Sequence, residues 1–74
     1  MCRSIQTLRR PDIPTTQEEI EAAALQFVRK VSGYRKPSRL NQAAFERAVA
    51  QVSAATIALL VDLGVKLDIQ EESL

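Results

Sequence analysis

The stretch of residues 38–63 constrains the fold more than any other part of the chain, because its apolar residues form two rows at helical spacing. The first row runs at alternating spacings of four and three residues, which suits knobs-into-holes packing. It comprises Phe45, Val49, Val52, Thr56, Leu59 and Leu63. A second row, displaced by about 140° around the helix, comprises Ala50, Ala54, Ile57 and Val61. One row can cover a neighbouring helix, and the other needs a different partner.

A shorter amphipathic helix is predicted at residues 16–32. Thr15 or Thr16 can form a capping box with the glutamate three residues further on. Gly33 can end the helix, because glycine adopts the left-handed conformation at little cost. The apolar face of this helix comprises Ile20, Ala24, Phe27, Val28 and Val31.

The linker of residues 33–37 is short, which predicts that the two helices are antiparallel neighbours. Residues 1–14 contain two of the three prolines and no helical period, so we expect an irregular N-terminal arm. Ser38 or Asn41 can cap the second helix, and residues 65–74 form a mixed tail. The sequence therefore predicts one small all-α domain over residues 1–74, an antiparallel helical hairpin preceded by an arm.

The two predicted helices differ in length, and this difference predicts self-association. At about 1.5 Å per residue, the first spans roughly 24 Å and the second roughly 33 to 37 Å, so the far end of the second is left uncovered. Leu8 and Ile13 of the arm can cover part of it, and a second copy of the chain can cover the rest. We therefore predict a dimeric four-helix bundle. Its candidate interface residues are Ala50, Ala54, Ile57, Leu60 and Val61. The alternative is a monomer whose arm and tail fold back over the second row.

The composition argues against catalysis and against a metal or cofactor site. The chain has no histidine and a single cysteine, Cys2, so it can form neither an intrachain disulfide nor a Cys/His zinc site. Cys2 remains a candidate reactive thiol, because the adjacent Arg3 favours the thiolate. No catalytic constellation accompanies it, which predicts a non-enzymatic protein. One unpaired cysteine, without an apolar export signal, is typical of a cytoplasmic protein.

Basic residues gather around the predicted turn. Five of them fall within eleven residues that contain no acid, namely Arg29, Lys30, Arg35, Lys36 and Arg39. If the arm returned along the first helix, Arg3, Arg9 and Arg10 would join them. Nucleic-acid or phosphate binding is therefore an alternative hypothesis, with Arg3, Tyr34, Arg35, Lys36 and Arg39 as candidate contacts. The opposing interpretation is an ordinary solvated surface, since only one aromatic residue lies in the turn.

Several separate stretches of the chain match one known family. They are Met1-Cys2-Arg3-Ser4-Ile5, residues 23–33, and Lys36-Pro37-Ser38 followed by Asn41, Ala44-Phe45 and Ala48-Val49. Over residues 1–63 the chain resembles the short bacterial proteins of the domain of unknown function 2277. The resemblance implies a stand-alone bacterial protein and supplies no activity, ligand or catalytic residue.

The leading hypothesis is therefore a helical interaction module that forms a homodimer and can bind a protein partner. A membrane partner is not expected, for two reasons. No segment approaches the roughly 20 apolar residues that span a bilayer, and the second apolar row lacks the basic flanks of an interfacial helix.

Overall fold

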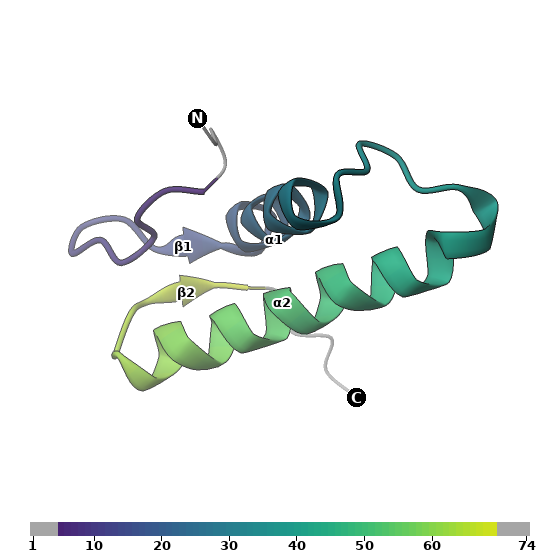
Figure 1. The fold of residues 1–74 in the computed structure, drawn as a ribbon. Coiled ribbons are helices and arrows are strands. Elements are labelled where there is room, and N and C mark those ends of the chain that lie inside the picture. Colours follow the sequence, from purple (N-terminus) through teal and green to yellow (C-terminus); the bar gives the residue numbers. More distant parts are fainter. Residues whose placement is uncertain (1–4, 70–74) are drawn as a thin grey trace.

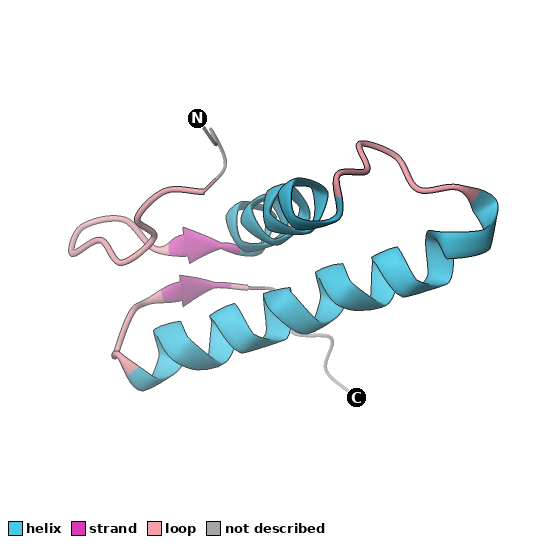
Figure 2. Cartoon of the chain, viewed as in Figure 1, coloured by secondary structure: helices cyan, strands magenta, loops and turns pink. Residues whose placement is uncertain are grey.

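The computed structural model describes residues 5–69, which form a mostly helical chain with a small two-stranded sheet (Figures 1 and 2). The elements are β1 (Thr15–Thr16), α1 (Gln17–Ser32), the 3-10 helix η1 (Arg39–Asn41), α2 (Gln42–Asp62) and β2 (Leu67–Asp68). The strands pair in parallel, with Thr15 opposite Leu67 and Thr16 opposite Asp68. The predicted all-α class is therefore corrected, because part of the predicted tail forms a strand.

The limits of α1 follow from its caps, as the sequence predicts. The Thr16 hydroxyl accepts the Glu19 N–H at 3.2 Å, and the Glu19 carboxylate accepts the Thr16 N–H at 3.0 Å. Gly33 ends the helix at φ 77° and donates its N–H to the Arg29 carbonyl at 2.9 Å. Of the two candidate threonines, Thr16 is the cap, and Thr15 is buried in β1.

The start of α2 differs from the prediction. Ser38 precedes η1 and Asn41 precedes α2, but neither side chain caps the helix that follows it. The Asn41 side-chain amide instead donates to the Tyr34 hydroxyl at 3.3 Å. At the other end, Gly64 adopts φ 79°, and the next N–H, from Val65, bonds to the Leu60 carbonyl at 2.9 Å. This turn sends the chain back toward α1, where β2 pairs with β1.

The two helices cross steeply. In Figure 1, α1 is strongly foreshortened whereas α2 lies across the picture. The molecule is accordingly flat, with extents of 40 × 37 × 17 Å, and its radius of gyration of 13.3 Å exceeds the roughly 11 Å of a compact domain of this length. The helices keep the antiparallel order of the predicted hairpin, since Ile20 at the start of α1 packs with Leu60 near the end of α2, but they do not pack side by side along their lengths. The connection is longer than predicted, since α2 begins only after η1, and it does not hold the helices side by side.

The core lies where the arm and the segment after α2 meet the helices. Within residues 5–69 the buried apolar side chains are Leu8, Ile20, Ala24, Val28 and Leu60. Leu8, Ile20 and Leu60 form one cluster. Ile57, Val65, Leu67 and Ile69 pack against it. We call this cluster, with β1 and β2, the closed end.

Part of the predicted burial is confirmed and part is wrong. Leu8 covers the far part of α2, as expected, and the chain after α2 folds back as in the monomer alternative. Ile13 is exposed and covers nothing. Val31 is 70% exposed and Phe27 is 48% exposed, although both belong to the predicted apolar face of α1. Val31 lies in the last turn of α1, beyond the crossing with α2, and Phe27 faces an open groove along α2 instead of being sealed by it.

One helical stretch within residues 5–69, Arg39–Asp62, is long and apolar enough to cross a membrane by length and composition alone. This differs from the expectation that no such segment exists. Only 6% of its most apolar window is buried, so it is not an ordinary core helix. Little of its surface is therefore fully buried by the rest of residues 5–69.

Candidate functional site

An open apolar groove lies between α1 and α2, and we call it the Phe27–Leu59 groove. Its volume is about 430 Å³. It is lined by Phe27, Ala48, Gln51, Val52, Ala55, Thr56 and Leu59. It continues into a hollow of about 290 Å³ beside the arm, which shares Phe27 and Leu59 and adds Ile5. The side chains of Phe27 and Leu59 are each about half exposed, so the groove presents apolar surface to solvent.

The sequence predicted apolar faces that include Phe27 and Leu59, but it did not predict a groove between them. Phe27 belongs to the predicted apolar face of α1 and Leu59 to the first row of α2, so both were expected to be covered by the neighbouring helix. The prediction failed because it assumed that the helices run side by side. Because the helices cross steeply, the apolar face of α1 and the first row of α2 cover one another only near the crossing point and are exposed to solvent elsewhere.

The predicted interface residues lie on α2 but are divided between two surroundings. Ala50, Ala54 and Ile57 line a second groove of about 520 Å³, whose polar wall includes Glu21 and Glu46. Val61 is 56% exposed. Leu60 is only 5% exposed and belongs to the core, so its assignment to the interface is corrected. The chain that turns back after α2 covers it.

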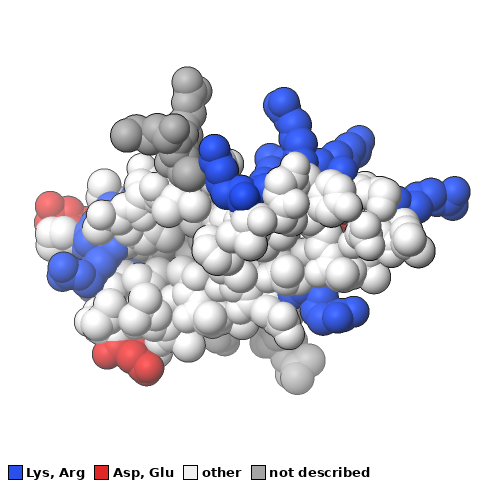
Figure 3. All heavy atoms as spheres, in the orientation of Figure 1, with Lys and Arg blue, Asp and Glu red and all other residues white. Residues whose placement is uncertain are grey.

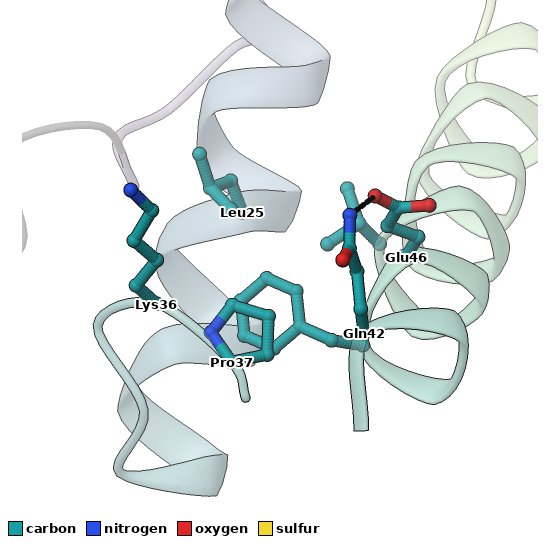
Figure 4. Close-up of a pocket in the computed structure, with 7 residues that line it drawn as sticks. Leu25, Lys36, Pro37, Gln42 and Glu46 are labelled. Atoms are coloured by element: carbon teal, nitrogen blue, oxygen red, sulfur yellow. Dashed lines mark hydrogen bonds between the residues drawn. The ribbon is translucent and has the colours of Figure 1, made fainter. Parts of the chain in front are cut away.

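A third hollow, of about 400 Å³, lies where the linker meets the two helices (Figure 4). Lys36 and Pro37 bound it on one side, and Leu25 of α1 lies above them in this view. On the other side the Gln42 amide donates to the Glu46 carboxylate at 3.0 Å, drawn as a dashed line. One cation and one hydrogen-bonded carboxylate on apolar walls form no nucleophile–base pair. Residues 5–69 also contain no group of three or more side chains suited to holding a metal ion.

The end of the molecule where α1 passes into the linker is strongly basic, and we call residues 29–41 the basic tip. Five exposed cations belong to it, namely Arg29, Lys30, Arg35, Lys36 and Arg39. Figure 3 shows blue side chains gathered over this end and red ones at the opposite end. Tyr34, the predicted stacking residue, is also exposed. The structure thus brings together the predicted contacts of the turn.

The arm does not contribute Arg10 to the basic tip. Arg10 forms two hydrogen bonds with Glu19, at 2.8 and 2.9 Å, in the first turn of α1, and a third with the Pro14 carbonyl at 3.1 Å. The two bonds from Arg10 to Glu19, together with the bond from the Thr16 N–H, lower the pKa of Glu19 to about 2. The expectation that Arg10 joins the turn is therefore wrong, since the pair lies at the opposite end of α1. Arg9 lies between Leu8 and Arg10 and so does not join the basic tip either. Cys2 and Arg3 lie outside the described residues.

Comparison with known protein families identifies the family of the chain. The family model described as Uncharacterized conserved protein (DUF2277) matches residues 1–72. The chain belongs to this family. The resemblance noted in the sequence is thereby confirmed. A comparison with curated proteins gave no match, and neither did a comparison with solved structures. In this member of the DUF2277 family, the candidate functional surfaces are the Phe27–Leu59 groove and the basic tip.

Proposed function

We propose that this DUF2277 protein is a non-enzymatic interaction module whose Phe27–Leu59 groove is closed by a second copy of the chain. One observation carries the proposal. Within residues 5–69 only five apolar side chains are buried, whereas nine large hydrophobic side chains are exposed. A small chain with so limited a core gains stability by oligomerisation, and apolar surface of this kind is typical of an interaction site.

The groove has the features that a symmetric partner requires. Its lining combines two large, half-exposed side chains, Phe27 and Leu59, which would act as knobs, with the small side chains of Ala48 and Ala55, which would act as holes. A two-fold interface uses the same patch on both copies, so knobs and holes must lie on one face, as they do here. A face of a molecule measuring 40 × 37 Å is wide enough to bury the roughly 800 Å² per partner of a stable dimer. Two copies would bring four helices together.

The groove along Ala50 and Ala54 is a second surface, and we rank it lower. Gln17, Glu21 and Glu46 line it, and charged residues are depleted at the centres of stable interfaces. Ala50, Ala54, Ile57 and Val61 therefore remain candidate contacts, for a different protein partner or for an edge of the dimer.

A matched pair of substitutions separates the two surfaces. Leu59 and Val61 are both 56% exposed and lie two residues apart, so they point to nearly opposite sides of α2. A lysine at either position lies near the C-terminal end of the helix, where a cation is favourable to the helix dipole. We expect sedimentation equilibrium to give a dimer for the wild type and for Val61→Lys, and a monomer for Leu59→Lys.

Circular dichroism should show native helicity for both variants. A wild type that stays monomeric at every concentration would remove the proposal. Dissociation by Val61→Lys alone would transfer the interface to the Ala50–Ala54 side.

Nucleic-acid or phosphate binding at the basic tip is the second candidate. It is supported by the exposure of Arg35, Lys36 and Arg39. It is weakened by the engagement of Arg10 elsewhere and by the single aromatic residue, Tyr34, because single-strand binders stack several bases on aromatic side chains. Fluorescence titration with RNA and DNA at two salt concentrations tests it, with Arg35→Ala/Lys36→Ala as the variant. Binding that is absent, or insensitive to salt and to the variant, excludes it.

A further inference from the structure

The basic tip carries exposed aliphatic side chains among its cations. Leu40, in η1, is 89% exposed, and Val31, in the last turn of α1, is 70% exposed. They are the two most exposed of the large hydrophobic side chains in the described part of the chain. Arg39 directly precedes Leu40, and Lys30 directly precedes Val31. Water is a poor environment for such side chains, so this end of the molecule is suited to a partner that is both apolar and anionic.

The positive charge at the tip is local. Residues 29–45 contain five basic residues and no acid, whereas the whole chain has a net charge of only +1. The ion pair recorded within residues 5–69 joins Arg10 and Glu19, at the far end of α1. The next acid in the sequence, Glu46, is hydrogen-bonded to Gln42 and lines the same hollow as Lys36. Five cations against this one carboxylate still leave a positive field at this end of the molecule.

An anionic bilayer satisfies both features at once. Its headgroups carry negative charge that attracts clustered Lys and Arg side chains. Directly beneath them, the acyl boundary accepts aliphatic groups. Tyr34 is suited to the headgroup layer, where an amphipathic ring has an apolar and a polar side. A nucleic-acid backbone would engage the cations but would leave Leu40 and Val31 in water.

We propose that the basic tip docks on an anionic membrane surface, with Leu40 and Val31 entering the headgroup–acyl boundary and the surrounding cations contacting lipid phosphates. The mode is peripheral. If α2 spanned the bilayer, Leu60 would have to leave its contacts with Leu8 and Ile20 at the closed end. The tip is also distinct from the second apolar row, for which the sequence argued against a membrane. The Phe27–Leu59 groove stays available to a second copy.

Flotation of the full chain with lipid vesicles tests the proposal. The vesicles are phosphatidylcholine alone, or phosphatidylcholine with one third phosphatidylglycerol. We expect binding to the anionic vesicles only, weakening as salt is raised. Arg35→Gln/Lys36→Gln should weaken it about 30-fold, from two lost headgroup attractions. Leu40→Ser should weaken it about tenfold, because an aliphatic side chain no longer enters the boundary.

Two matched controls lie away from the tip. Arg9→Gln removes an exposed cation of the arm, and Leu63→Ser removes an exposed leucine beyond α2. Neither should change flotation, and all variants should keep the wild-type circular dichroism spectrum.

Three results would overturn the proposal. The first is binding that is absent or equal on neutral vesicles. The second is binding that the charge variant weakens but Leu40→Ser does not, with RNA or DNA bound more tightly than vesicles, since this would identify a nucleic-acid site. The third is retention on vesicles through high-salt and alkaline washes, since this would indicate that α2 spans the bilayer.

Discussion

The closed end and the basic tip differ in how they treat apolar side chains: the closed end buries them, and the basic tip leaves them exposed. Both connect α1 with α2 or with the chain that follows α2. At the closed end, the parallel pair of β1 and β2 supplies backbone hydrogen bonds, and Leu8, Ile20 and Leu60 exclude water. At the tip, the linker and η1 leave Val31 and Leu40 in solvent. The contacts that stabilise the monomer are therefore concentrated at the closed end, whereas the basic tip presents apolar side chains to solvent.

The largest expected effect compares two residues of α1. Ile20 is fully buried at the closed end, and Val31 is exposed at the tip. We expect Ile20→Ala to lower the free energy of unfolding by about 2 to 5 kcal/mol, from lost burial and the cavity left behind. Val31→Ala should change it by less than about 0.5 kcal/mol. Urea denaturation followed by circular dichroism measures both, and similar costs would contradict the division into two ends.

A smaller effect is expected at Thr15, which connects three segments of the closed end. It is fully buried, its N–H donates to the Lys66 carbonyl at 3.0 Å, and its hydroxyl donates to the Leu8 carbonyl. Thr15→Val keeps the shape but leaves the Leu8 carbonyl without this donor, at a cost of about 1 to 3 kcal/mol.

The serine variant provides the control for Thr15. Thr15→Ser keeps the hydroxyl and should lie between the wild type and the valine variant in urea denaturation. A valine variant as stable as the wild type would show that the hydroxyl does not hold the arm.

The smallest effect should come from the half-buried pair of Arg10 and Glu19. Hydrogen bonds from Arg10 lower the pKa of Glu19 from 4.5 to about 2, so the folded state binds the proton less readily than the unfolded chain. The stabilisation is therefore fully present above pH 4.5 and is lost as the pH falls toward 2. In urea titrations, the stability difference between the wild type and Glu19→Gln should shrink over this range. A difference that does not vary with pH would rule out this linkage.

Local sequence signals predicted local structure well in this chain. The capping box of Thr16 and Glu19 and the stop at Gly33 each depend on a few neighbouring residues, and both are confirmed. The strands were missed because two residues of β2 carry no periodicity. They pair only because Gly64 turns the chain back toward β1.

The sequence by itself determined where the helices lie, which of their rows are apolar and where the cations gather, because these properties follow from residue order and helical geometry. Only the tertiary structure decided which apolar side chains are covered. Leu59 and Leu60 are neighbouring leucines of α2, yet Leu60 is sealed in the core and Leu59 opens into a groove. The physical reason is the steep crossing of α1 and α2, which is set by contacts between segments distant in sequence and not by the pattern within either helix.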